Sequence, residues 1–198
     1  GEEIKPDPDS FVMLHAGMVT PEFRDPFPLL EVLAELVKQE KLPRKEVRVC
    51  FQGGGSYVES AAFTERVRAL GVPGLVEVRP RVSYYEALRC LFRAHALVLL
   101  QDSEDTRHLI PAKAFEYLRA GRPVVALTNK GATADLIRET GAGYVMDPKE
   151  PAEIRAALLN LFSRNGHAPG RPARAPDALK KYERRSQAER LASVLEGL

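Results

Sequence analysis

Residues 109–127 read LIPAKAFEYLRAGRPVVAL and combine a helix and a strand in one short segment. Pro111 suits the first turn of a helix, where its missing N–H costs little. Gly121, followed two residues later by Pro123, is typical of a helix end. The apolar run Pro123–Leu127 is typical of a buried strand. The segment therefore predicts a helix that leads directly into a strand.

The rest of the chain repeats this alternation of apolar runs and stretches with helical spacing. Such an alternation indicates βαβ units and an α/β fold, with a parallel sheet covered by helices on both faces. The expected strands are Phe11–Ala16, Glu46–Gln52, Leu75–Arg79, His95–Leu100, Pro123–Leu127 and Gly143–Met146. The expected helices are 27–41, 57–70, 83–93, 111–120, 131–140 and 150–164.

The chain has 198 residues, of which 44% are hydrophobic and 28% charged, and a formal net charge of +2. These values indicate a soluble globular domain with a sizeable core. The nearly neutral balance argues against a dedicated nucleic-acid binder, which usually carries a strong basic excess. No apolar run approaches the ~20 residues of a membrane span. Cys50 and Cys90 lie in apolar runs, so we expect a cytoplasmic location without disulfides or a zinc site.

Composition divides the chain into four parts. The polar residues 1–10 show no signal sequence and are interpreted as a linker remnant, and 11–164 form the expected domain. Residues 165–176, NGHAPGRPARAP, are interpreted as a Gly/Pro/Arg linker that is solvated or touches the inner face of a membrane. The amphipathic residues 177–198 are expected to form a C-terminal helix that packs back on the domain or on a missing N-terminal domain.

Ligands of open parallel sheets bind outside the carboxyl ends of the strands. The loop 101–111 is the most informative there, because Lys113 stands in the first turn of the helix that follows. Free N–H groups and the helix dipole already form an anion site at that place. A cation there is otherwise unfavourable, so an anionic ligand would explain Lys113. An exposed ion pair with Glu116, three residues later, is the alternative.

Other candidates lie in the loops on the same side of the sheet. Gly17 directly follows the first strand and would let the backbone approach a ligand, and Arg24 could grip phosphate oxygens. The alternative is a turn glycine beside a solvated arginine. His108 lies in the loop on the ligand side and is the one histidine that we expect to have a functional role. His15 and His95 are interpreted as residues at strand ends whose hydrogen bonds are satisfied by their neighbours.

Two patterns are interpreted as non-functional. The glycines at 53–55 do not fit GxGxxG, which would need a glycine where Val58 stands. Asp102, Glu104 and Asp105 are interpreted as a solvated acidic loop, because a hard cation needs several converging oxygens. We therefore expect no metal site.

Several segments resemble one family. PAKAFEYLRAGRPVVA at 111–126 looks like the hallmark segment of the donor-binding C-terminal domain of glycosyltransferase family 4, the retaining enzymes of the GT-B fold. FVMLHAGMVTPEFRDPFPLLEVLAEL at 11–36 and VEVRPRVSYYEALRCLFRAHALVLLQ at 76–101 follow the same order, so the resemblance covers about residues 10–198. It implies a Rossmann-like, doubly wound, parallel six-stranded sheet with helices on both faces, which is one half of a GT-B fold.

The resemblance implies roles for the basic and acidic candidates. Arg24 and Lys113 match positions that neutralise the donor diphosphate and stabilise it as a leaving group. Glu116 matches the acid that holds the ribose of the nucleotide. Gly17 matches the glycine over which donor and acceptor approach each other.

The resemblance also implies roles for two loops. Pro80, Arg81 and Val82 correspond to the loop where backbone groups hold the nucleobase, and Ile110 lies where backbone amides meet the phosphates. His108 is placed where many members carry an acid that contacts the sugar. The way in which those members recognise the sugar therefore does not apply to this chain.

The resemblance implies that the chain is the nucleotide-sugar donor-binding domain of a retaining glycosyltransferase of the hexosyltransferase type. A UDP-sugar is among the candidate donors, and the resemblance implies no cofactor and no obligatory metal. The acceptor would be held by an N-terminal domain that is missing here, so the fragment alone is expected to be inactive. One alternative is a sugar-nucleotide epimerase of the same fold. Another is a non-catalytic doubly wound binding module; a receiver domain is disfavoured because 14–17 read Leu-His-Ala-Gly instead of carrying acids.

Overall fold

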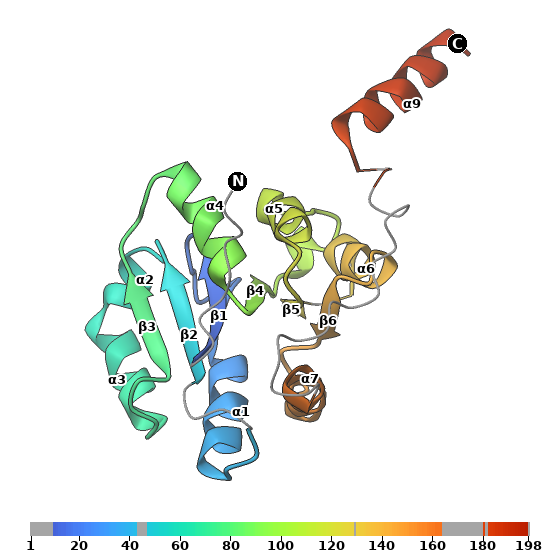
Figure 1. Cartoon of the computed structure of the whole chain (residues 1–198). Helices are drawn as coiled ribbons and strands as arrows, with labels where there is room; N and C mark the ends of the chain where they lie inside the picture. Colours follow the sequence, from blue (N-terminus) through green and yellow to red (C-terminus); the bar gives the residue numbers. More distant parts are fainter. Residues whose placement is uncertain (1–9, 43–46, 129, 164–179, 181, 198) are drawn as a thin grey trace.

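The six apolar runs form six parallel strands in one sheet (Figure 1). The computed structural model describes residues 10–42, 47–128, 130–163, 180 and 182–197. Its strands are β1 (Phe11–Ala16), β2 (Val47–Gln52), β3 (Val76–Arg79), β4 (Ala96–Gln101), β5 (Val124–Thr128) and β6 (Gly143–Met146). They lie within one residue of the predicted bounds; Glu46, predicted to open the second strand, lies outside the described residues.

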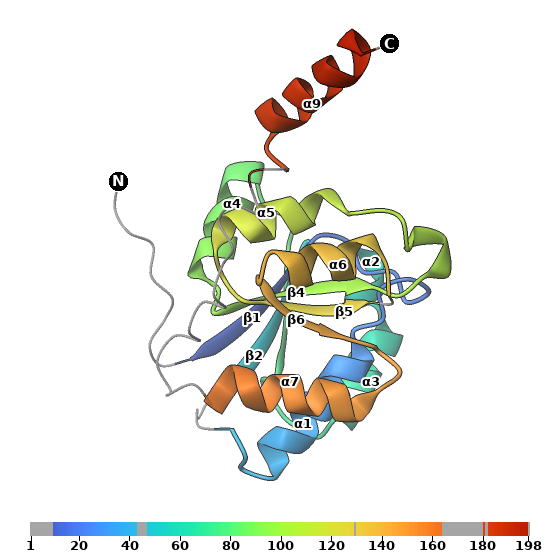
Figure 2. The ribbon, with the colours of Figure 1, turned by 90° about the vertical axis from the view of Figure 1, so that its right-hand side faces the viewer.

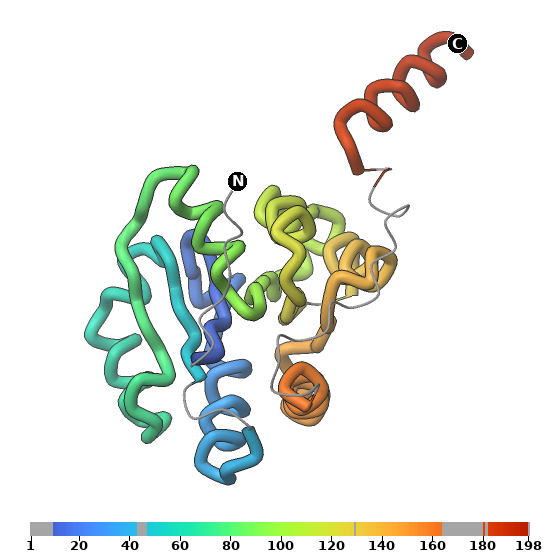
Figure 3. Tube along the Cα trace, in the orientation of Figure 1, coloured from blue at the N-terminus to red at the C-terminus, as the bar shows by residue number. Residues whose placement is uncertain are grey.

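The strand order is β3-β2-β1-β4-β5-β6, so β1 pairs with both β2 and β4. The chain winds outward from β1 to one edge, then returns to β4 and winds to the other edge, as the tube in Figure 3 shows. This is the doubly wound Rossmann order, which confirms the predicted fold class. The loops after β1 and β4 meet at the reversal point, where ligands of such sheets bind.

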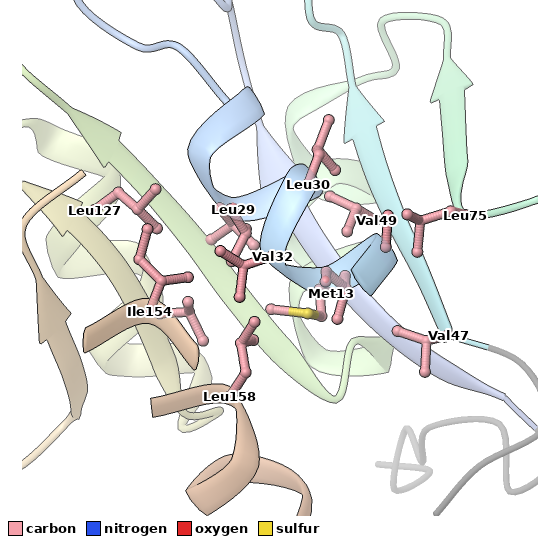
Figure 4. Packing of buried hydrophobic residues seen from close by; sticks show 14 of the residues in the cluster. Met13, Leu29, Leu30, Val32, Val47, Val49, Leu75, Leu127, Ile154 and Leu158 are labelled. Atoms are coloured by element: carbon pink, nitrogen blue, oxygen red, sulfur yellow. The ribbon is translucent and has the colours of Figure 1, made fainter. Parts of the chain in front are cut away.

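Helices cover both faces of the sheet (Figure 2). One apolar cluster joins the sheet to α1 (Phe27–Lys38), α3 (Ala61–Ala69) and α7 (Pro151–Ser163). The other joins it to α4 (Tyr84–Arg93), α5 (Ala112–Ala120) and α6 (Ala132–Glu139). Figure 4 shows side chains of α1, α7 and the sheet gathered around the buried Met13.

Two predicted helices differ from the observed ones. The helix expected at 57–70 is two helices, α2 (Ser56–Glu59) and α3, because Ser60 is extended and its Oγ accepts the Phe63 N–H at 3.2 Å. This side-chain cap starts a new helix. The first helix ends at Lys38 rather than 41, since Glu40 adopts a left-handed φ of 52°.

The C-terminal segment forms α9 (Arg184–Glu196), none of whose described residues is buried. It projects away from the sheet in Figures 1 and 2. Just before it, the ring of Tyr182 lies 5.8 Å from that of Phe115 in α5. Packing of this segment on another part of the protein stays a prediction. Residues 1–9 and the linker at 165–176 lie outside the described part of the chain.

No helix within the described residues is long and apolar enough to cross a membrane.

A buried hydrogen bond joins α5 to the end of β1. The side chain of Tyr117 is fully buried, and its hydroxyl accepts the Ala16 N–H at 3.0 Å. Burial raises the pKa of this hydroxyl, so it stays protonated. The bond fixes the start of α5 beside the reversal point of the sheet.

We expect Tyr117→Phe to lower the free energy of unfolding by about 1–3 kcal/mol, because it leaves the Ala16 N–H without its acceptor. Urea unfolding followed by circular dichroism measures the change. Tyr182→Phe is the control, since it removes a hydroxyl bonded to the exposed Glu139 at 3.1 Å, and it should change stability by less than about 0.5 kcal/mol. Equal stability of Tyr117→Phe and the wild type would contradict this role.

Candidate functional site

The N-terminus of α5 opens toward the reversal point. Pro111 occupies the N-cap position with an extended ψ of 142°, and no side chain caps the helix. The positive end of the helix dipole is therefore available for an anion. Lys113 stands in this first turn, as the sequence predicts.

The Lys113 ammonium group lies directly against Gly17. Gly17 has a φ of 97°, and its N–H donates to the Gln52 carbonyl at 2.9 Å. A Cβ at Gly17 would lie 3.3 Å from Lys113 Nζ. A side chain here would be strained and would press on the ammonium group. The glycine thus leaves room for a cation above the end of β1.

Arg24 brings a second cation to the same region. Its Nη1 donates to the Met18 carbonyl at 3.3 Å, which folds the side chain back along its own loop. The Asp102 N–H donates to the Phe23 carbonyl at 2.7 Å, which ties the loop after β1 to the end of β4. The structure thereby brings Gly17, Arg24 and Lys113 to the same region.

The electrostatics favour an anion at this place. Burial, and after it the nearby charge of Arg24, lower the pKa of Lys113 to about 8. Glu116 has the opposite effect, without a salt bridge to Lys113 among the described residues. A partly desolvated ammonium beside a guanidinium is stabilised when negative charge binds between them.

His15 is a further residue of this site, and its contact with Lys113 was missed by the sequence interpretation. Its side chain is fully buried, with Nδ1 2.9 Å from the Val98 carbonyl and Nε2 3.4 Å from Lys113 Nζ. Burial lowers its pKa to about 3, so the ring is neutral at physiological pH. The only signal in the sequence is a polar residue in an apolar strand, two positions before Gly17.

A cleft of about 350 Å³ extends from this point toward the end of β3. The side-chain amide of Gln52 donates to the Pro80 carbonyl, which holds the loop after β3 against β2. The cleft is lined by Ala16, Gly17, Met18, Gln52, Gly53, Arg81, Val82, Tyr84 and Ala87. The structure therefore brings Arg81 and Val82 to the same cleft as Gly17.

Glu116 lines a neighbouring groove of about 500 Å³, between α5 and the segment that precedes α9. Tyr84 lines both this groove and the cleft, so the two hollows adjoin. Glu116 is three residues from Lys113 on α5, which places both side chains on the same side of the helix.

The loop between β4 and α5 carries the remaining predicted residues. Gln101 holds it by donating to the carbonyls of Thr106 at 2.8 Å and Leu109 at 3.2 Å. Ile110 is partly buried against the apolar cluster beneath α5. His108 is exposed in this loop. The described residues contain no group of three or more His, Cys, Asp or Glu that could hold a metal.

The profile of one protein family, described as Glycosyl transferases group 1, matches residues 10–164. The chain belongs to this family. A comparison of this chain with curated proteins found no match.

Solved structures share the fold of this glycosyl transferases group 1 chain. HepE of Anabaena in complex with UDP-glucose is 17% identical with a TM-score of 0.70, covering 98% of this chain and 54% of HepE. TarM of S. aureus, in a complex that includes UDP, is 18% identical with a TM-score of 0.69, covering 92% of this chain and 34% of TarM. The chain thus spans about half of the length of HepE and about a third of the length of TarM.

A third structure is the C-terminal domain of a glycosyl transferase group 1 family protein, LpcC of Francisella tularensis. It is 16% identical with a TM-score of 0.66, and the match covers 88% of this chain and 87% of LpcC's domain. At this identity the likeness shows the fold alone.

We expect Lys113→Met to stabilise the ligand-free chain at pH 7 by up to roughly 3 kcal/mol, because the folded state disfavours the charged lysine. The pKa of Lys113 is lower in the folded chain than in the unfolded one. The penalty is therefore complete below about pH 8 and fades as the pH rises toward the unfolded value of 10.5. Thermal unfolding of both proteins at several pH values measures this.

Lys149→Met is the control, because Lys149 is exposed. It should change stability by less than about 0.5 kcal/mol at any of these pH values. A loss of stability in Lys113→Met at pH 7 would contradict this expectation, because it would show that the ammonium group stabilises the ligand-free fold.

Proposed function

We propose that this chain is the nucleotide-sugar donor-binding domain of a retaining glycosyltransferase of the GT-B type, similar to family 4. The observation that carries the proposal is the partly desolvated Lys113 ammonium, held at the uncapped start of α5 above Gly17 and beside Arg24. Two cations and a helix dipole converge at the reversal point of the sheet, which suits a diphosphate. Membership of the glycosyl transferases group 1 family supports the same function.

The donor would extend from this diphosphate site along the adjoining hollows. Arg81 and Val82 line the cleft that would take the nucleobase, and Pro80 shapes their loop through Gln52. Glu116 would bind the ribose hydroxyls from the neighbouring groove. A uridine nucleotide is the first candidate, because the HepE and TarM complexes contain UDP-glucose and UDP.

In the proposed reaction, the bond between the anomeric carbon and the diphosphate oxygen breaks. The acceptor hydroxyl oxygen bonds to that carbon on the same face, and its proton passes to the departing diphosphate. Negative charge accumulates on the departing diphosphate. Lys113, Arg24 and the N-terminus of α5 stabilise this charge more in the transition state than in the ground state. Because these groups supply positive charge, we expect no obligatory metal.

The acceptor would be held by a second domain outside this chain. The chain spans 54% of HepE, which supports a larger whole protein. We also infer a cytoplasmic location, because Cys50 is buried and Cys90 partly buried as free thiols.

Calorimetric titration of the 198-residue chain with UDP, GDP and ADP tests the proposal. We expect saturable binding of one diphosphate at pH 7, unchanged by EDTA. Lys113→Ala and Glu116→Ala should each weaken it roughly tenfold to a hundredfold, which corresponds to the loss of a hydrogen bond to a charged group. Affinity should fall as the pH rises above about 8, because the Lys113 ammonium then loses its proton.

Lys149→Ala is the matched control, and its affinity should equal that of the wild type. Failure of all three diphosphates to bind, or full affinity in Lys113→Ala, would contradict the proposed donor site.

A further inference from the structure

The buried ring of His15 is the only described polar side chain of β1, and it lies directly beneath the diphosphate site. Its exposed fraction is 0%, and its ring centroid is 6.1 Å from that of Phe51 on β2. Packing on β1 and β2 therefore prevents the ring from turning toward solvent. A polar ring is kept in such a place only if both nitrogens have partners.

The ring has three polar neighbours, the backbone of Val98 and of Met18 and the Lys113 ammonium, and the closest contacts determine where its proton lies. The Val98 carbonyl, 2.9 Å from Nδ1, can only accept a hydrogen bond, so Nδ1 carries the hydrogen. In a neutral imidazole this leaves a lone pair on Nε2. The Lys113 ammonium, 3.4 Å from Nε2, has only donors, so its contact with this lone pair is complementary.

We propose that His15 is a positioning residue of the donor site, which uses the Nδ1–H tautomer to hold the Lys113 ammonium against Gly17 where the diphosphate binds. This inference rests on the proposed function of the site. It assigns a role to a residue on β1 that touches no substrate and acts through Lys113.

A neutral acceptor is well suited to this task. A carboxylate at this position would orient the ammonium but would also neutralise it and repel a diphosphate. A neutral imidazole orients the ammonium and leaves its charge available. Without an acceptor, the flexible lysine would turn away from the charge of Arg24, which faces it from the loop after β1.

The protonation of His15 does not compete with this role. The charged groups that act on it are Lys113 from α5 and Arg24 from the loop after β1, and both disfavour its protonated form. Glu116 on α5 acts on Lys113 and favours the ammonium. Above about pH 5 the ring is neutral, so of these two contacting groups Lys113 is the one that titrates near physiological pH.

His15→Asn and His15→Gln separate the two ring contacts. Asparagine can place an amide N–H where Nδ1 lies and keep the bond to Val98, but it has no atom at the position of Nε2. Glutamine can place an amide oxygen near that position and accept from Lys113. His95→Asn is the matched control, because His95 is also buried and accepts the Val12 N–H through Nδ1 at 3.1 Å, at the opposite end of the sheet.

The first measurement follows the ε-CH₂ resonance of Lys113 by NMR while the pH is raised, with no nucleotide present. We expect His15→Asn to lower the pKa of Lys113 by roughly half a unit or more, because the ammonium loses an acceptor. The second measurement is the affinity for UDP and UMP at pH 7. We expect His15→Asn to weaken UDP binding roughly tenfold and UMP binding less, and His15→Gln to recover part of the loss.

His95→Asn should lower stability yet leave both the Lys113 pKa and the UDP affinity unchanged. The proposal is overturned if a folded His15→Asn keeps the wild-type Lys113 pKa and UDP affinity. Should both His15 variants fail to fold, the ¹⁵N spectrum of the wild-type ring still decides, since a proton on Nε2 would overturn the proposal and one on Nδ1 would support it. Wild-type chain that binds no UDP refutes the proposed function, whereas the Lys113 pKa and the His15 tautomer test this inference separately.

Discussion

The hydrogen bond from the Ala16 N–H to the buried Tyr117 hydroxyl holds the start of α5 over the end of β1. Tyr117 lies four residues after Lys113, so the two side chains share one face of the helix. The bond that anchors Tyr117 at Ala16 therefore places Lys113 one turn earlier, above Gly17. This bond fixes the stretch of α5 from which the Lys113 side chain extends, and the ammonium group at its end lies 3.4 Å from His15 Nε2.

The site is built from features that cost stability. A lysine near a helix N-terminus opposes the dipole, and its low pKa shows that the fold disfavours its charge. Gly17 adopts a φ of 97°, which only glycine adopts without strain. Such local conflicts gather where a protein binds or reacts, because a ligand relieves them. An anion would remove the conflict at Lys113, whereas a purely structural lysine would have no reason to lie there.

The sequence predicts what depends on local pattern. The six strands follow from apolar runs, of which those of β1, β2, β4 and β5 are mostly buried and those of the edge strands β3 and β6 only partly. The proposed anion site follows from Lys113 at the start of a predicted helix. The break at Ser60 was not predicted, because serine also occurs inside helices and only the Phe63 N–H shows that it acts as a cap. The contact between His15 and Lys113 joins residues 98 positions apart. It depends on strand order and helix placement, which no local pattern contains.

Donor binding and glycosyl transfer make separate demands on the structure. The cations that would face the diphosphate come from the loop after β1 and from α5, so this chain contains the whole proposed diphosphate site. The loops at the same edge also expose Met18, Phe23 and Leu109, apolar side chains that are 59%, 48% and 60% accessible. Covering exposed apolar groups with another surface is favourable, because it removes their apolar area from water. A second domain placed over this rim would cover them and exclude water from the donor, which strengthens the action of Lys113 and Arg24 on the leaving diphosphate. On the proposed function, binding would require only this fold, whereas transfer would require the covering surface as well.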